Sequence, residues 1–215
     1  MEEEKVINLK MGIVYLFGGR LYDFLDEHFE KTRYKKIREK ILPKLKGRIL
    51  DAGCGTGNNL GYYPRSASVL GVDNSEPMLK TARKKVGDLK NIEIKEMDVI
   101  KIELPNNHFD VVVASFLLCT MPMKYEKLAL KELIRVAKPG AKLYFLEYIY
   151  SKNKTRKFFM KITSPIARLL YSLRFDTTLP LIKKEKNLKI ERLELVHDDV
   201  VRLIVVKKAK HKKAS

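Results

Sequence analysis

The sequence predicts an α/β fold built on a doubly wound, mostly parallel sheet. Strand-like and helix-like segments alternate along most of the chain, and this order produces parallel strands with helices on both faces. Apolar runs such as Val111–Val113 do not alternate with polar residues, as expected for a parallel strand that is covered on both faces. With 215 residues, the chain is long enough for one domain with a full core, which we place at residues 1–206.

The first segment, residues 1–45, is predicted to be a helical lid. Apolar residues recur at helical spacing over 5–31, with a break at Gly18 and Gly19. A further helix is expected from Tyr34 to Leu45, and Gly47 would follow its end. Its apolar face would carry Ile37, Ile41 and Leu42, and its polar face would carry Lys35, Lys36, Arg38 and Lys40.

The alternating elements follow this lid. Strands are predicted at 48–51, 69–73, 92–95, 109–114 and 142–148, with helices near 58–62, 76–86 and 125–137. Two closing strands are predicted at 188–196 and 200–206. The lysine-rich tail, 207–215, is expected to be disordered.

A glycine-rich turn follows the first predicted strand, in the stretch Asp51-Ala-Gly-Cys-Gly-Thr-Gly57. Gly53, Gly55 and Gly57 have no Cβ, so a ligand can approach the backbone closely. A strand, a glycine turn and a helix start together form a cradle for a nucleotide-like ligand.

Polar side chains fall at or just past the ends of four strands: Asp51, Asp73, Asp98 and Ser115. Parallel strands place these ends on one edge of the sheet, where ligands bind. An acid such as Asp73 can accept hydrogen bonds from both hydroxyls of a ribose. Asp51 would repel the pyrophosphate of NAD but suits the amino group of S-adenosylmethionine.

Five motifs in order resemble those of class I S-adenosylmethionine-dependent methyltransferases. They are Asp51–Gly57, Gly71-Val-Asp-Asn-Ser-Glu-Pro-Met78, Met97-Asp98, Phe109–Ser115 and Lys138-Pro-Gly140. The resemblance covers about residues 33–150 and implies a seven-stranded, Rossmann-like sheet with an antiparallel finish, and S-adenosylmethionine as the cofactor.

The resemblance also implies roles for individual residues. Asp51 would meet the cofactor's ammonium directly or through water, and Asp73 would bind the ribose hydroxyls. Asn74 and Met78 would flank the adenine, while Asp98 and the Val99 N–H would bind its polar edge. For each acid, an ordinary helix cap or a solvated turn is the alternative. Tyr22-Asp23 resembles a pair in the lid of related enzymes, which implies that Tyr22 lies near the methionine end of the cofactor.

The stretch after the fourth strand points to the kind of acceptor. Ala114-Ser115-Phe116-Leu117 lacks the Asn/Asp-Pro-Pro-aromatic signature of enzymes that methylate nucleobases or glutamine. Apolar residues are expected to form an acceptor wall or to pack in the core: Phe116, Leu117, Leu118, Cys119, Met121 and Met123. No catalytic residue is assigned, because Glu147 and His197 are only weak candidates for a base.

Residues 151–185 are predicted to form a basic amphipathic insertion before the last strands. Seven basic residues and no acid lie between Ser151 and Phe175, with apolar residues at helical spacing. Ser164-Pro165 is expected to split this stretch into two helices. Such a surface can lie on an anionic membrane, or it can simply cover the substrate pocket.

Composition limits the remaining choices. The net charge of +18 would attract phosphate backbones, but aromatic and basic residues are not interleaved on any expected strand surface. No secretory signal or membrane span is evident, which predicts a cytoplasmic protein with or without peripheral membrane contact. The two cysteines and four histidines form no disulfide framework or metal-ligand spacing. Abundant Lys, Glu and Ile without Gln or Trp favour a thermophilic source.

The combined pattern most resembles small phospholipid N-methyltransferases and their quinone- and thiol-methylating relatives. It predicts methyl transfer to a lipid amine head group similar to phosphatidylethanolamine at a membrane surface. A lipophilic quinone or thiol is the second hypothesis, and an RNA-directed methyltransferase is the third. A non-catalytic cofactor-binding protein is disfavoured by the intact glycine loop and Asp73.

Overall fold

The computed structural model describes residues 34–210. Their elements, in chain order, are α4 (Lys35–Ile41), the 3₁₀ helix η2 (Leu42–Lys44), β1 (Arg48–Ala52), η3 (Leu60–Tyr62), β2 (Ser68–Asp73), α5 (Glu76–Val86), β3 (Ile92–Glu96), β4 (Phe109–Ser115), η4 (Leu118–Thr120), α6 (Met123–Val136), β5 (Ala137–Tyr148), α7 (Lys154–Tyr171), α8 (Thr178–Ile182), β6 (Leu188–His197) and β7 (Val201–Lys208).

The seven strands form one mixed sheet in the order β3-β2-β1-β4-β5-β7-β6. The five strands from β3 to β5 are parallel, and β7 pairs antiparallel with both β5 and β6. Strand order reverses between β1 and β4, and such a switch point opens a crevice at the carboxyl ends of the strands. The doubly wound class I fold with its antiparallel finish is therefore confirmed.

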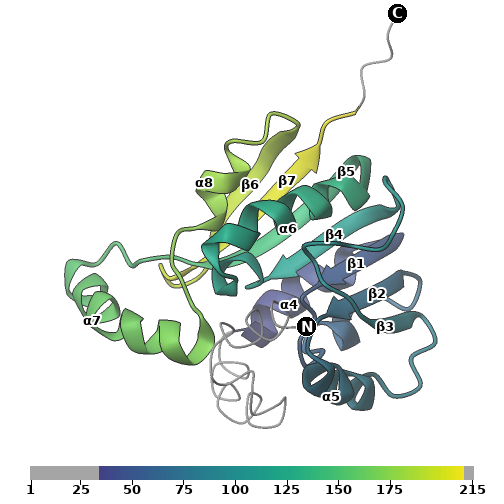
Figure 1. Ribbon diagram of the computed structural model, residues 1–215, viewed down its shortest axis with the longest axis horizontal. Helices are drawn as coiled ribbons and strands as arrows, with labels where there is room; N and C mark the ends of the chain where they lie inside the picture. Colours follow the sequence, from purple (N-terminus) through teal and green to yellow (C-terminus); the bar gives the residue numbers. More distant parts are fainter. Residues whose placement is uncertain (1–33, 211–215) are drawn as a thin grey trace, which may run out of the picture.

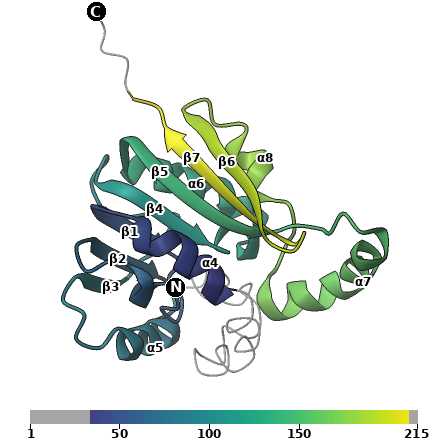
Figure 2. The ribbon, with the colours of Figure 1, turned by 180° about the vertical axis from the view of Figure 1, so that it is seen from behind.

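Helices cover both faces of the sheet, which explains the unbroken apolar runs of the central strands. Figure 1 shows α6 and α8 on one face, and Figure 2 shows α4 on the opposite face. The α6 side buries Leu50, Val112 and Leu143 of the sheet, and the α4–α5 side buries Ile49, Val69 and Val113. Neighbouring residues of one strand thus point into two different cores, as the period of two requires.

Several predicted boundaries differ from the structure. The helix expected at 58–62 is only the 3₁₀ helix η3, and the strand expected at 142–148 begins at Ala137. The start of the tail is not disordered, because Lys207 and Lys208 belong to β7. The Lys208 Nζ donates to the carbonyl oxygens of Ile134 and Ala137, which holds this strand end against the end of α6.

The predicted split of the basic insertion at Pro165 is wrong. One helix, α7, runs from Lys154 to Tyr171 with Pro165 inside it. Proline cannot donate to the carbonyl four residues earlier. Here the Ser164 Oγ donates to that carbonyl, on Lys161, at 2.9 Å, so the carbonyl keeps a partner and the helix continues. In Figures 1 and 2, α7 projects from the body of the molecule as an arm.

Candidate functional site

The strand ends surround a cavity of about 590 Å³. Its walls come from the glycine turn, the ends of β2, β3, β4 and β5, the first turn of α4 and one side of α7. This volume lies within the usual range for small-molecule sites. The convergence of strand ends that the sequence predicted is therefore present.

The glycine turn brings the backbone close to its neighbours at two positions. A Cβ on Gly53 would lie 2.6 Å from the Leu117 Cδ1, and a Cβ on Gly57 would lie 2.9 Å from the Ala82 Cβ. Both glycines also have positive φ, of 67° and 79°. Gly53 lines the cavity, whereas Gly57 allows α5 to pack against the turn. Gly55, also with positive φ, lies open to the cavity.

Asp73 holds the turn and faces the cavity at the end of β2. Its Oδ2 accepts from the Gly55 N–H and its Oδ1 accepts from the Ser75 N–H, both at 3.0 Å. Burial raises the pKa of this carboxyl, and the hydrogen bonds from backbone amides lower it. Each carboxylate oxygen keeps a further lone pair, so the group can accept from two neighbouring hydroxyls of a ribose.

The segment after β3 completes the same end of the cavity. Asp98 and Val99 line it next to Asn74 and the nearly fully buried Met78. The Asp98 Oδ1 accepts from the Ile100 N–H at 3.0 Å, which fixes the carboxylate at this edge. Apolar surfaces flanked by a carboxylate suit a flat base that carries an amino group. This end therefore fits the adenosine part of S-adenosylmethionine.

Asp51 lies behind the cavity wall and is completely buried. The Asn59 Nδ2 donates to the Asp51 Oδ1 and to the Ser115 Oγ, at 3.2 Å each. Burial raises the pKa of Asp51 to about 7, although Asn59, Tyr63 and Arg38 lower it. Ser115 and Asn59 line the cavity in front of this carboxyl, so Asp51 would act on an ammonium group through them.

Arg38 is the site residue that the sequence pattern placed on the wrong face. It was expected on the polar, outward face of its helix, but it is only 8% exposed and lines the cavity. Its Nε donates to the Asn59 Oδ1 at 2.7 Å. The network thus places the Arg38 cation and the buried carboxyl group of Asp51 side by side, where they suit the carboxylate and the ammonium at the amino-acid end of S-adenosylmethionine.

The opposite end of the cavity is aromatic. The rings of Tyr34, Phe116, Tyr148 and Phe175 come from four separate segments and line this end. Phe116 and Tyr148 stack with centroids 4.7 Å apart, Tyr34 lies 5.1 Å from Phe116, and the hydroxyls of Tyr34 and Tyr148 are hydrogen-bonded. Sequence reasoning singled out Phe116 alone, because residues distant in the chain give no local signal of such a cluster.

The expected apolar wall is present in part. Phe116, Leu117 and Met121 line the cavity, whereas Leu118 and Cys119 are buried in the core and Met123 is 74% exposed. Phe116 adopts a positive φ of 57° at the end of β4. This backbone turn directs the chain away from the sheet and into the cavity wall.

Neither weak candidate for a base lies in the cavity lining. Glu147 is completely buried, and its carboxylate accepts from the Arg202 guanidinium at 2.6 Å and from the Thr178 N–H at 2.9 Å. It therefore joins β5, β7 and the start of α8. His197 lies at the end of β6 and is also absent from the cavity lining. Tyr22 lies outside the described residues, so its role stays a prediction.

Comparisons with known proteins agree with this geometry. Residues 50–145 match the protein family described as a methyltransferase domain. The demethylmenaquinone methyltransferase of Staphylococcus saprophyticus is 30% identical over 170 residues, which are 77% of this chain and 67% of that protein. The phosphatidylethanolamine N-methyltransferase of Cereibacter sphaeroides is 32% identical over 137 residues, 62% of each chain.

Further similarities extend the same pattern. The human thiol S-methyltransferase is 27% identical over 147 residues, 66% of this chain and 59% of that protein. This chain therefore spans about three fifths of the length of the thiol and phospholipid enzymes. Solved structures of S-adenosylmethionine-dependent methyltransferases from Methanosarcina mazei and Aquifex aeolicus superpose with TM-scores of 0.61 and 0.59, at 21% and 23% identity. They cover 76% and 81% of this chain, and it covers 93% and 89% of theirs, which supports the fold.

Proposed function

Because the chain belongs to the class I S-adenosylmethionine-dependent methyltransferases, we propose that it methylates a lipid amine head group, similar to phosphatidylethanolamine, at a membrane surface. S-adenosylmethionine is its methyl donor. The proposal concerns the acceptor, on which the relatives differ: their names specify a quinone, a thiol and phosphatidylethanolamine.

The observation that carries the proposal is the contrast between the two ends of one cavity. One end has the carboxylates of Asp73 and Asp98, and the other has the rings of Phe116, Tyr148 and Phe175. Aromatic faces attract organic cations and offer a large apolar surface. The aromatic end therefore suits an amine on a lipophilic molecule better than a strongly polar acceptor.

S-adenosylmethionine supplies a methyl group on a sulfonium, which a nucleophile displaces in line. The methyl moves from sulfur to nitrogen, S-adenosylhomocysteine leaves, and the amine proton passes to solvent. The protein contributes by orienting the two reactants and excluding water. Phe116 and Tyr148 would hold the acceptor, while Asp73 and the Arg38–Asn59–Asp51 network would hold the donor.

A quinone is the second candidate. Phe116 and Tyr148 are stacked with 28° between their planes, and the outer face of such a pair offers a surface on which a flat ring can stack. The demethylmenaquinone relative supports this hypothesis, and the human relative supports a thiol.

The direct test offers the purified protein radiolabelled S-adenosylmethionine together with separate acceptor pools. We expect label in phosphatidylethanolamine from a total lipid extract. Label in a quinone or a small thiol would reject the lipid amine as the acceptor in favour of that second class of acceptor. Label in RNA alone would overturn both hypotheses.

Two neighbouring substitutions separate the acceptor end from the cofactor end. Phe116→Asp puts a charge among the rings and should lower kcat/KM at least about tenfold, with S-adenosylhomocysteine affinity nearly unchanged. Aspartate tolerates the positive φ at this position, so the backbone is not strained. Leu117→Asp should lower both quantities, because the Leu117 side chain packs directly on Gly53.

The control for these variants is Met123→Asp, a charge of the same sign at an exposed position outside the cavity lining. Steady-state kinetics and calorimetry provide the two measurements. Equal loss of cofactor affinity in Phe116→Asp would contradict the assignment of the aromatic end to the acceptor.

A further inference from the structure

Helix α7 forms part of the cavity wall although none of its residues is fully buried. Met160, Ala167 and Tyr171 line the cavity and follow one another at intervals of seven and four residues. This spacing places them on one side of a helix. We call this side, which faces the cavity, the inner side of α7.

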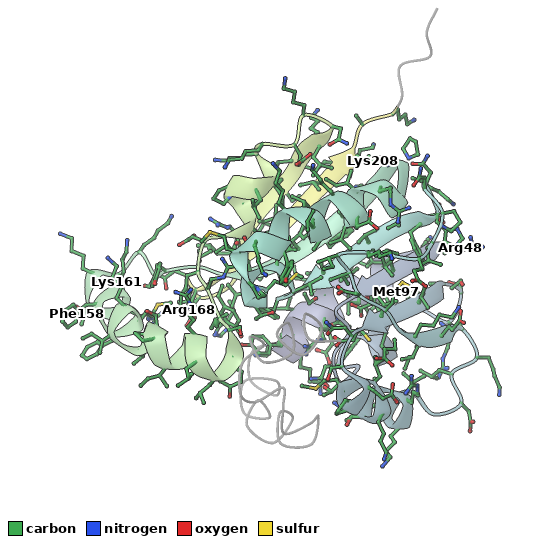
Figure 3. All side chains as sticks on the ribbon, in the orientation of Figure 1. Arg48, Met97, Phe158, Lys161, Arg168 and Lys208 are labelled. Atoms are coloured by element: carbon green, nitrogen blue, oxygen red, sulfur yellow. The ribbon has the colours of Figure 1, made fainter. Side chains whose placement is uncertain are left out.

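The outer side of α7 carries apolar side chains that nothing in the described part of the chain covers. Phe158, Phe159, Ile162, Ile166 and Leu169 are each between 56% and 62% exposed. Phe158 and Phe159 are neighbours, and the following residues come at intervals of three and four, so all five lie along one side of the helix that differs from the cavity side. Figure 3 shows Phe158 at the outer part of the arm, away from the sheet. Single exposed apolar residues are ordinary, but five in one stripe mark an interaction surface.

A third stripe of α7 is cationic. Lys154, Lys157, Lys161 and Arg168 are all exposed and follow one another at intervals of three, four and seven residues. The helix contains no acidic residue. An apolar stripe next to a basic one is typical of helices that lie in the interface of an anionic bilayer. Within residues 34–210, no helix is long and apolar enough to cross a bilayer.

The arm is fixed to the body at its N-terminal end. Asp199, in the turn between β6 and β7, accepts from the Ser151 Oγ at 2.6 Å, the Lys152 N–H at 2.7 Å and the Arg156 guanidinium at 2.9 Å. The Asn153 side chain caps the helix by accepting from the Arg156 N–H at 3.0 Å. These contacts give the outer face of α7 a set direction relative to the cavity.

We propose that α7 docks on an anionic lipid surface with its outer apolar stripe among the head groups, so that the cavity behind its inner side opens at the membrane. The proposal rests on the proposed lipophilic acceptor and adds how that acceptor reaches the aromatic end. Basic residues near an anionic surface contribute attraction that salt screens, and the apolar stripe adds a part that salt does not screen. The positive charge of the helix favours this partner over a second copy of a chain with net charge +18.

The test is co-sedimentation of the full chain with phosphatidylcholine vesicles, with and without phosphatidylglycerol, at low and high salt. We expect binding to the anionic vesicles that weakens with salt. Exchanging Lys154, Lys157, Lys161 and Arg168 for glutamine should lower vesicle affinity about tenfold or more. The matched control exchanges Lys84, Lys90, Lys101 and Lys131 for glutamine; these lysines are equally charged and exposed but lie outside α7.

The apolar stripe has its own variant. Phe158→Ser with Ile162→Ser should weaken vesicle binding at both salt concentrations, whereas Leu193→Ser with Leu195→Ser, two exposed residues of β6, should not. S-adenosylhomocysteine affinity should stay unchanged in every variant, because none of these side chains lines the cavity.

Three outcomes would overturn the docking proposal. The first is no vesicle binding under any condition, and the second is that RNA displaces the protein from vesicles at a much lower concentration than competing anionic lipid does. The third is a dimer in solution that dissociates in the Phe158→Ser, Ile162→Ser variant. Methylation of phosphatidylethanolamine dispersed in detergent, without vesicle binding, would keep the lipid amine as the acceptor and reject docking. Vesicle binding without methylation of any lipid would keep the docking proposal and reject the lipid amine as the acceptor.

Discussion

Arg38 is the residue that we expect to bind the carboxylate at the amino-acid end of the cofactor. Its guanidinium lines the cavity and is held by Asn59, which also holds Asp51. A ligand's carboxylate would meet the Arg38 cation at this network, and its ammonium would meet the acceptor oxygens of Asn59 and Ser115 in front of Asp51. Arg38→Met should therefore weaken binding of S-adenosylhomocysteine about 10- to 100-fold, the value of a charge-assisted hydrogen bond.

Calorimetry with 5′-methylthioadenosine provides the comparison, because this ligand lacks the amino-acid end. Its affinity should change less than about twofold in Arg38→Met. The matched variant, Arg83→Met, removes an exposed arginine that pairs with Glu76 on α5 and should affect neither ligand. An equal loss for both ligands would show that Arg38 supports the fold rather than the carboxylate.

Asp51 predicts a pH dependence of stability. Burial raises its pKa from 3.8 to about 7, so between these values the folded protein keeps a proton that the unfolded chain has released. Stability should therefore fall as pH rises toward 7 and level off above it, by an amount on the order of 4 kcal/mol across the interval. Urea unfolding at several pH values between about 5 and 8 measures most of this change in the free energy of unfolding.

Asp51→Asn is the test of this assignment. The amide does not titrate, so the variant should lose the part of the slope that Asp51 contributes. Asp73, whose pKa is also raised, remains in both proteins, so the difference between their slopes measures Asp51 together with its repulsion by Asp73. Identical slopes in the wild type and the variant would contradict a buried, neutral Asp51.

At the scale of elements, Glu147 joins three of them. Its carboxylate binds Arg202 of β7 and the N–H of Thr178 in α8 from a fully buried position on β5. Glu147→Ala leaves the guanidinium without its nearest anion and should lower the free energy of unfolding by about 3–5 kcal/mol.

The exposed pair of Glu194 and Arg192 provides the control for this prediction. Their guanidinium and carboxylate lie 2.8 Å apart on β6, but solvent screens them. Glu194→Ala should leave the urea midpoint nearly unchanged in the same titration. Similar losses for the two variants would mean that burial adds nothing to the Glu147 pair.

At the scale of the whole molecule, the cofactor should stabilise the fold. Its site draws on the ends of β2, β3, β4 and β5 and on α4, so a ligand there binds only the folded chain. S-adenosylhomocysteine at 100 times its Kd should raise Tm by about 5–10 °C. Asp73→Ala should lose most of this shift at the same ligand concentration, since the ribose hydroxyls lose their acceptor.

Asp88→Ala is the control for Asp73→Ala, because Asp88 is an exposed acid just beyond α5. It should keep the full thermal shift. A shift with NADH and none with S-adenosylhomocysteine would contradict the cofactor.

Features that depend on local sequence were predicted well. The alternation of strands and helices follows from hydrophobic periodicity, and the glycine turn follows from residues that tolerate positive φ. Once the sheet is parallel, its topology brings all strand ends to one edge, so Asp73, Asp98 and Ser115 could be placed together before any coordinates.

Features that depend on packing between distant segments required the tertiary structure. Periodicity divides a helix into faces but does not say which neighbour a face meets, so it missed the burial of Arg38 against Asn59. It also placed a break at Pro165 because it could not foresee the Ser164 hydroxyl on the Lys161 carbonyl. The ring cluster around Phe116 joins segments up to 141 positions apart, from Tyr34 to Phe175. Local sequence thus predicted the glycine turn and the carboxylates at the proposed cofactor end, whereas long-range packing brought in Arg38 and the rings of the proposed acceptor end.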